Sequence, residues 1–184
     1  MVARIKSLIT LLTIFCHKIW DNVYRAFRGM PTLKRSQITA NLFLGSQYTL
    51  MGLRRMKALG ITAIINMREH SVYSEAQYEG FKYLHLPTID NTPPELSVLT
   101  EGADFADHEI ANGGKIYIHC RQGLGRGPTM TIAYLLKTGL SYQDAFALVK
   151  KVRTFINPRP SQIKRLKELE TYYKNNNDSA KSTP

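Results

Sequence analysis

The sequence predicts an α/β protein: a central, mostly parallel twisted sheet with helices on both faces. Short apolar, β-branched runs alternate along the chain with segments of helical pattern, and Gly or Pro residues separate them. Parallel strands need long crossover connections, so this alternation favours a parallel sheet covered by helices. The chain has 184 residues, 43% of them hydrophobic, which is enough to bury one full core.

The first half of the predicted domain contains three strands and two helices. The strands are short apolar runs, and the one that reads Ile61-Thr62-Ala63-Ile64-Ile65-Asn66-Met67 is the most clearly buried. Gly60 and Gly80 mark where the two helices end. The expected strands are 38–44, 61–67 and 82–86, and the expected helices are 50–59 and 73–78.

The second half continues the alternation. A helix at 95–112 ends in the turn Gly113-Gly114, and an apolar strand at 115–119 follows. Three more helices are expected to start at Gly127, Ser141 and Pro160. Ser141 stands three residues before Asp144, a variant of the capping box that marks a helix N-terminus.

The most informative segment joins the 115–119 strand to the helix that follows, and reads His119-Cys120-Arg121-Gln122-Gly123-Leu124-Gly125-Arg126. A tight loop into a helix N-terminus points backbone N–H groups at one spot, and the helix dipole adds to their attraction for an anion. The same field favours a thiolate, which is the nucleophilic form of cysteine. The segment therefore predicts a phosphate site with a nucleophile beneath it; the alternative is a buried Cys beside a Gly-rich turn.

With His119 before the Cys, Gly at the third position after it and Arg126 at the sixth, the segment resembles the signature loop of cysteine-dependent protein tyrosine phosphatases. The resemblance is strongest to small single-domain members of the dual-specificity branch. It implies that Cys120 attacks phosphorus to give a phosphocysteine and that Arg126 donates hydrogen bonds to two phosphate oxygens at once. His119 would lie behind Cys120 and tune its reactivity. The implied phosphate-binding residues are Arg121, Gln122, Gly123, Leu124, Gly125 and Arg126, through their backbone donors.

The resemblance also implies a general acid, because an alkoxide or phenoxide leaves poorly unless it is protonated. Asp90 stands thirty residues before Cys120, in a loop between the 82–86 strand and Pro93-Pro94. Asp104 and Asp107 are the alternatives. Both fall within the helical pattern of 95–112, where a solvated helix face is the expected position.

One position departs from the family pattern. The residue after the signature Arg is usually Ser or Thr, whose hydroxyl helps the Cys to leave, but here it is Gly127. Thr129, two residues later, is the candidate to supply that hydroxyl. Without it, breakdown of the phosphocysteine is expected to be slow.

The resemblance spans about residues 39–169 and includes the opening strand at 40–46. Arg68 and Glu69 follow the second predicted strand, and would either line the pocket or form a surface pair. Arg159 would either meet a second substrate charge or be solvated.

The chain divides into three expected parts: a basic amphipathic helix and linker at 1–35, the catalytic domain at 36–174, and a polar, disordered tail at 175–184. The apolar run at 7–16 is too short to span a bilayer, which takes about 20 residues, and no signal-peptide cleavage site follows it. Arg4 and Lys6 precede this run, and apolar positions continue to Phe27 with basic residues between them. Such a helix either lies in a membrane interface or packs on the domain.

The composition of the chain limits the classes of partner and ligand that are expected. The net charge of +11 and the pI of about 9.7 suit anionic lipid or phosphorylated substrates, and no nucleic-acid motif accompanies them. Two cysteines give no disulfide framework, and a reactive thiolate implies a reducing, intracellular compartment, with peripheral contact to an anionic membrane through residues 1–30. The histidines are scattered without metal-ligand spacing, so neither a metal nor a cofactor is expected.

The resemblance thus predicts a metal-independent phosphomonoester hydrolase, with phosphotyrosine or phosphoserine/threonine proteins as the first substrate class. The alternative is a phospholipid such as phosphatidylglycerophosphate or a phosphoinositide, because small lipid-acting members also carry an apolar N-terminal helix. A minor alternative, supported only by Gly127, is a pseudophosphatase that binds phosphate without turnover.

Overall fold

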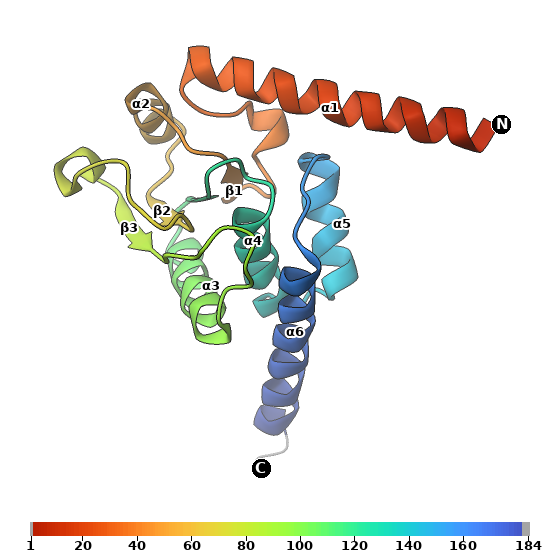
Figure 1. The fold of residues 1–184 in the computed structure, drawn as a ribbon. Helices are drawn as coiled ribbons and strands as arrows, with labels where there is room; N and C mark the ends of the chain where they lie inside the picture. Colours follow the sequence, from red (N-terminus) through yellow and green to blue (C-terminus); the bar gives the residue numbers. More distant parts are fainter. Residues whose placement is uncertain (1, 182–184) are drawn as a thin grey trace.

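The computed structural model describes the backbone of residues 2–181 and the side chains of residues 8–176. At its centre lies a four-stranded sheet in the order β1-β4-β2-β3, and every neighbouring pair is parallel (Figure 1). The predicted fold class is confirmed. The strands are β1 (Leu42–Gly45), β2 (Ala63–Asn66), β3 (Lys82–His85) and β4 (Ile116–His119).

Alternating side chains divide the sheet between two cores, because successive residues of a strand point to opposite faces. Leu44, Ile65 and Ile118 belong to the larger core, which the C-terminal helices complete. Phe43, Ile64 and Tyr117 point the other way, into a smaller, tyrosine-rich core shared with α2 (Leu50–Ala58). The helices of the larger core are α3 (Leu96–Ala111), α4 (Arg126–Lys137), α5 (Tyr142–Val152) and α6 (Pro160–Lys181).

The observed strands are shorter than the apolar runs that predicted them. The expected first strand began at Ile38, but the N–H groups of Ile38 and Thr39 both donate to the Leu42 carbonyl, so these residues form a turn. The short helix expected at 73–78 is a 3₁₀ turn, η2 (Glu75–Tyr78). At the start of α5, the Ser141 hydroxyl accepts from the Asp144 amide, as expected of an N-cap, and also donates to the Asp144 carboxylate.

The register of the sheet brings the four strand ends together. Gly45, His119, Asn66 and His85 are the last residues of their strands, and each is paired with its neighbour across the sheet. The loops that follow the strands therefore leave from one edge. In open α/β sheets this carboxyl edge is where ligands bind.

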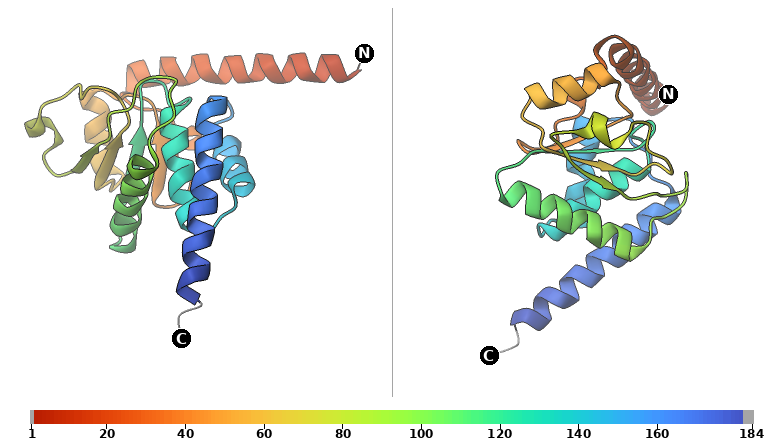
Figure 2. Two further views of the ribbon diagram at one scale, coloured as in Figure 1. Left: turned by 60° about the horizontal axis from the view of Figure 1, so that its bottom comes forward. Right: turned by 90° about the vertical axis from the view of Figure 1, so that its left-hand side faces the viewer.

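The N-terminal helix α1 (Val2–Arg28) lies across one end of the domain, and its first part extends beyond the other elements (Figures 1 and 2). Arg25 donates to the Gln47 carbonyl, and His17 contacts the Thr154 hydroxyl at 3.0 Å. One face of α1 therefore packs on the domain, while another leaves large apolar side chains exposed: Leu8, Ile9, Leu11, Leu12, Phe15, Ile19, Trp20, Val23 and Phe27. The side chains of Arg4 and Lys6 lie outside the described residues.

No helix among residues 2–181 is long and apolar enough to cross a membrane.

The C-terminal segment corrects one expectation. The tail was expected to be disordered from Asn175, but α6 continues to Lys181. Extending an existing helix adds one hydrogen bond for each residue fixed, so polar residues of weak helix propensity can follow a helix that is already formed. Residues 182–184 lie outside the described residues.

Candidate active site

The Cys120 loop (residues 120–126) connects β4 to α4 and forms the floor of the site. Cys120 directly follows β4 and is 4% exposed, and its Sγ accepts a hydrogen bond of 3.2 Å from the Gly123 amide. Gly123 has φ of +67°, and a Cβ at this position would lie 2.5 Å from the Gly45 carbonyl oxygen. Only glycine fits here, because any side chain would push the loop away from the end of β1.

Arg126 is the first residue of α4, and its guanidinium is buried against the Asp90 loop (residues 86–94). Its Nη1 donates to the Thr88 carbonyl at 2.7 Å, and its Nη2 lies 3.0 Å from Asp90 Oδ1. Its Nε is buried and has no hydrogen-bond partner within the described part of the chain. The Thr88 carbonyl thus orients the guanidinium, and Nε is left as a buried donor without a partner among the described residues.

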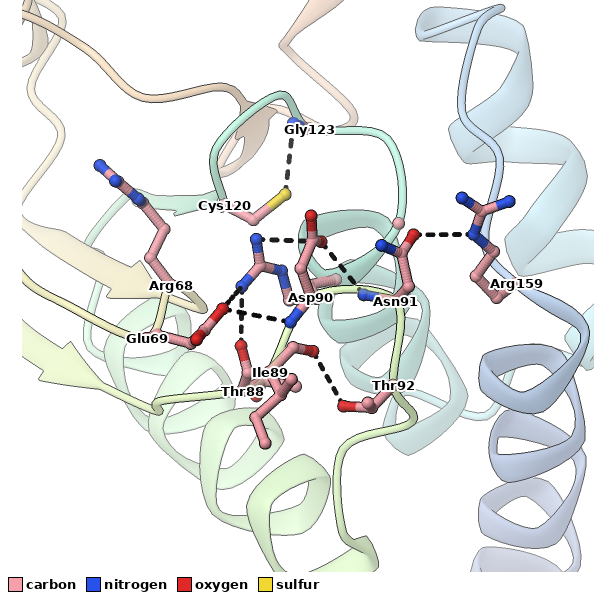
Figure 3. A network of polar contacts seen from close by, with 12 residues as sticks. Arg68, Glu69, Thr88, Ile89, Asp90, Asn91, Thr92, Cys120, Gly123 and Arg159 are labelled. Atoms are coloured by element: carbon pink, nitrogen blue, oxygen red, sulfur yellow. Dashed lines mark hydrogen bonds and ion pairs between the residues drawn. The ribbon is translucent and has the colours of Figure 1, made fainter.

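Asp90 lies in the predicted loop and faces the same guanidinium. Its side chain is 60% exposed, its Oδ1 accepts from the Asn91 amide, and its own amide donates to Glu69 Oε1 at 3.2 Å (Figure 3). Asn91 has φ of +64°, which asparagine tolerates better than most residues, and its Oδ1 accepts from Arg159 Nε. The loop is therefore fixed from both sides, with the carboxylate directed to Arg126.

The alternative acids occupy a different place. Asp104 lies on α3, where it pairs with Lys137 of α4 at 2.8 Å. Neither Asp104 nor Asp107 lines the cavity above Cys120. Of the three candidate carboxylates, only Asp90 lies near Cys120 and Arg126.

A cavity of about 250 Å³ opens above Cys120. Five of the six predicted phosphate-binding residues line it, whereas the Gly123 amide is turned to the sulfur instead. Arg159 is at the cavity rather than simply solvated, and Asn157 and Gln162 were not anticipated. The full lining is Asp90, Asn91, Cys120, Arg121, Gln122, Leu124, Gly125, Arg126, Asn157, Arg159 and Gln162.

Arg68 and Glu69 border a second hollow of about 180 Å³, which shares Asp90, Arg121 and Arg126 with the first. Glu69 Oε1 lies 3.6 Å from Arg126 Nη1, and Arg68 donates to the Gln47 side chain. Of the two expectations for this pair, the structure supports a position at the site. Among the described side chains, no group of three or more His, Cys, Asp or Glu could hold a metal ion.

His119 is fully buried behind the Cys120 loop. Burial lowers its pKa to about 3, so the imidazole is neutral at physiological pH. Its Nδ1 lies 3.3 Å from the Cys120 carbonyl oxygen, and its ring packs edge-on against Tyr48 with centroids 4.8 Å apart. His119 therefore contacts the backbone of the nucleophile as a neutral group.

The expectation that Thr129 replaces the hydroxyl missing at Gly127 is not supported. Thr129 is fully buried, and its hydroxyl donates to the Gly125 carbonyl at 2.9 Å, so it braces the turn into α4. A Cβ at Gly127, by contrast, would lie 3.3 Å from the Cys120 amide nitrogen and 3.2 Å from Leu44 Cδ1. Position 127, and not position 129, is adjacent to the nucleophile.

Sequence reasoning missed one pair of residues that touches the Cys120 loop. Arg153 is fully buried, donates to the carbonyls of Gln122 and Gly123, and pairs with Asp21 of α1. A signal was present, because Asp21 is the only acidic residue before Glu69 in an otherwise basic segment.

Comparison with known proteins agrees with this geometry. Residues 42–172 match the catalytic domain of dual specificity phosphatases. Mouse dual specificity protein phosphatase 1 is 34% identical over 138 residues, which are 73% of this chain and 37% of that protein. Mouse serine/threonine/tyrosine-interacting protein is 33% identical over 145 residues, 74% of this chain and 65% of that protein. The chain thus spans less than two thirds of either relative.

Solved structures give the same result. A crystal structure of PTPMT1 superposes with a TM-score of 0.74 at 28% identity and covers 78% of this chain and 98% of that one. PTPMT1 in complex with PI(5)P gives a TM-score of 0.71 at the same identity, covering 76% and 96% of the two chains. The human tyrosine phosphatase-like serine/threonine/tyrosine-interacting protein gives 0.68 at 31% identity, covering 79% and 98%.

We predict that His119 makes the protein sensitive to acid. The unfolded chain binds a proton at this imidazole near pH 6.5, whereas the folded chain resists protonation down to about pH 3. The free energy of unfolding should therefore fall as pH drops below 6.5, by up to about 1.4 kcal/mol per pH unit. His119→Gln should lose this contribution, as measured by urea denaturation at pH 7, 6 and 5.

His108→Gln, at an exposed position on α3, is the control and should keep the wild-type slope. An equal pH slope in His119→Gln and wild type would contradict the prediction.

Proposed function

This chain belongs to the dual-specificity phosphatase family, and on that premise we propose that it hydrolyses phosphate monoesters through a phosphocysteine. One observation carries the proposal: Cys120, Arg126 and Asp90 line a single cavity, and the guanidinium of Arg126 has a buried Nε donor with no partner in the described part of the chain. A buried donor without a partner costs free energy, which an anionic ligand would recover.

Substrate binding uses the free edge of the Arg126 guanidinium. Nη1 stays on the Thr88 carbonyl, while Nε and Nη2 take two phosphate oxygens in the fork that suits a planar guanidinium. Nη2 exchanges the Asp90 carboxylate for a phosphate oxygen, which frees Asp90 to act on the ester oxygen. The N-terminus of α4 adds a favourable field for the anion.

The first chemical step transfers the phosphoryl group to sulfur. The Cys120 thiolate attacks phosphorus, an S–P bond forms, and the P–O bond to the leaving group breaks. Asp90, which takes up a proton from solvent once it has left the guanidinium, gives that proton to the leaving oxygen. The Gly123 amide, which donates a hydrogen bond to Sγ, holds the nucleophile in place for attack.

The second step returns the enzyme to its starting state. Water attacks the phosphorus of the phosphocysteine, and Asp90, now a carboxylate, takes one of the water protons. The S–P bond breaks, which releases inorganic phosphate and the Cys120 thiolate. The attacking water supplies both the proton that Asp90 regains and the proton of the released phosphate.

For the substrate we propose phosphorylated protein, at tyrosine or at serine/threonine. Its support is the sequence similarity to proteins named as dual specificity protein phosphatases. The basic side chains Arg121, Arg68 and Arg159 at or beside the cavity suit an anionic substrate surface. The reactive thiol also supports an intracellular, reducing location.

A phospholipid substrate is the second candidate, and a specific observation favours it. Among the side chains that the structure describes in α1, nine large apolar ones are exposed, and the helix also carries Lys18, Arg25 and Arg28. Apolar and basic side chains together are what an amphipathic helix uses to lie on an anionic membrane. The similarity to PTPMT1, solved with PI(5)P, supports the same candidate.

A phosphate-binding protein without turnover is the third candidate, because one similar solved protein is tyrosine phosphatase-like. The presence of nucleophile, clamp and acid around one cavity favours hydrolysis instead.

We predict that the need for Asp90 depends on the leaving group. Asp90→Asn should lower kcat/KM, which reports the step in which the leaving group departs, on phenyl phosphate by about 10²- to 10⁴-fold, the usual contribution of a general acid. The loss should be smaller on p-nitrophenyl phosphate, whose phenoxide leaves without a proton. Cys120→Ser should abolish turnover of both esters. Asp104→Asn, which breaks only the pair with Lys137, is the matched control and should keep wild-type rates. Hydrolysis that survives Cys120→Ser would refute the mechanism.

A second prediction separates lipid from protein substrates. The double variant Leu11→Asp/Phe15→Asp should lower activity on phosphatidylglycerophosphate in anionic vesicles at least about tenfold, because burying each apolar side chain contributes about 1.5–3 kcal/mol. Activity on a soluble phosphotyrosine peptide should stay unchanged. Tyr172→Asp, at an exposed position on α6, is the control. An equal loss on both substrates, or no loss on the lipid, would remove the support that α1 gives to a lipid substrate.

A third prediction concerns Gly127. Gly127→Ser places a hydroxyl beside Cys120, whereas Gly127→Ala places only a methyl group in the same tight space. Because a hydroxyl can donate to the departing sulfur, the Ser variant should break down the phosphocysteine faster. In rapid-quench kinetics with p-nitrophenyl phosphate, Gly127→Ser should show a smaller initial burst than Gly127→Ala. Equal bursts would show that no hydroxyl is needed at this position.

A further inference from the structure

A buried ion pair joins the N-terminal helix to the end of α5. Arg153, which directly follows α5, places Nη2 3.0 Å from Asp21 Oδ2 of α1, and both side chains are almost fully buried. The pair bridges 132 residues of sequence. A buried charge is retained at little cost only when its partner and its hydrogen bonds are supplied, so the surroundings of Arg153 are informative.

The same guanidinium holds the Cys120 loop. Arg153 Nε donates to the Gly123 carbonyl at 2.9 Å, and Nη2 donates to the Gln122 carbonyl at 2.9 Å. Its Nη1 reaches the Arg35 carbonyl at 3.3 Å, and its plane lies over the Phe155 ring at 4.4 Å. Two consecutive carbonyls of the loop are thus directed at one cation.

Fixing a carbonyl also fixes the amide of the same peptide unit. In a planar trans peptide the C=O and N–H groups point in opposite directions, and the described chain has no cis peptide bond. The Gln122 carbonyl faces Arg153, and the amide of that unit, on Gly123, points to Cys120 Sγ. By the same geometry, a Gly123 carbonyl held by Arg153 turns the Leu124 amide away from Arg153, and Leu124 lines the cavity.

Asp21 is placed to serve this guanidinium. Its Oδ2 pairs with Arg153, and its Oδ1 is buried with no hydrogen-bond partner within residues 8–176. Asp21 lies outside the region matched by the dual specificity phosphatase family, which begins at residue 42, whereas Arg153 lies within it. The N-terminal helix thus brings a counter-charge to a residue of the catalytic domain.

We propose that Asp21 and Arg153 are positioning residues, through which α1 sets the direction of the Cys120 loop amides. The proposal rests on the proposed function for its catalytic readout, but not for its binding readout. Loss of the Asp21 charge leaves Arg153 buried without a counter-ion, so the guanidinium shifts and the two peptide units lose their orientation. Oxyanion binding and phosphoryl transfer then weaken without any change to a residue that touches substrate.

The test compares Asp21→Asn, Asp21→Glu and wild type as full-length chains, with tungstate as the oxyanion probe in calorimetry. Asp21→Asn should bind tungstate about tenfold more weakly and lose at least about tenfold in kcat/KM on p-nitrophenyl phosphate. Removing an oxyanion donor costs about 10²–10³ in rate, and a donor that is only misdirected should cost part of that. Asp21→Glu restores the charge and should recover part of both losses. The ¹⁵N amide resonances of Gly123 and Leu124 should shift in Asp21→Asn and return toward their wild-type positions in Asp21→Glu.

Tyr24→Phe is the matched control on α1, because it removes only a hydrogen bond to Arg55, distant in sequence from the Cys120 loop. It should bind tungstate as wild type does. A folded Asp21→Asn that binds tungstate within about twofold of wild type would overturn the proposal. If Asp21→Asn does not fold, Arg153→Lys replaces it, because lysine keeps the positive charge but lacks the guanidinium that donates to both loop carbonyls. Tungstate affinity in Arg153→Lys equal to that of Tyr24→Phe would then overturn the proposal.

The two proposals fail in different ways. A wild-type chain that binds tungstate but hydrolyses no phosphate ester would contradict the proposed function alone. A wild-type chain that hydrolyses esters, together with an Asp21→Asn variant that equals it in binding and rate, would contradict the positioning role alone.

Discussion

The buried guanidinium of Arg153 is the constraint on which the site depends. It contacts α1, the segment at Arg35 and the Cys120 loop, and the oxygen atoms that these segments supply offset the cost of burying its charge. On the other side of the loop, Gly123 fits under β1 only because it has no side chain. The loop is therefore held from both sides, and the parallel sheet provides the frame for this arrangement.

The charged groups at the cavity are arranged around the Arg126 guanidinium. Arg126 is satisfied on one edge by a backbone carbonyl, and Asp90 and Glu69 balance it when no phosphate is bound. The same carboxylate that shields the clamp is the proton donor of the proposed reaction. In the proposed reaction, binding of phosphate and release of the acid are one exchange at one guanidinium, which links recognition of the phosphate to the first chemical step.

The alternation of strands and helices predicted the fold, and the resemblance to the phosphatase signature supplied Cys120, Arg126 and Asp90, which line one cavity in the structure. Strand ends were less predictable, because apolar residues such as Ile38 also fit a turn that precedes the ladder. The direction of the Thr129 hydroxyl depends on helix geometry that the sequence does not reveal. The Asp21–Arg153 pair joins distant segments, and isolated charges are usually solvated, so the pattern of neighbouring residues gave it no weight.

The distance in sequence between Asp21 and Arg153 also has a consequence during biosynthesis. A ribosome adds about 5–20 residues each second, so the 132 residues that separate the pair take on the order of ten seconds to make. During that time the α1 segment, with its apolar side chains and its single acidic residue, has been made, but Arg153 has not. The nascent helix is thus available to a membrane surface or a chaperone before it can dock on its own domain.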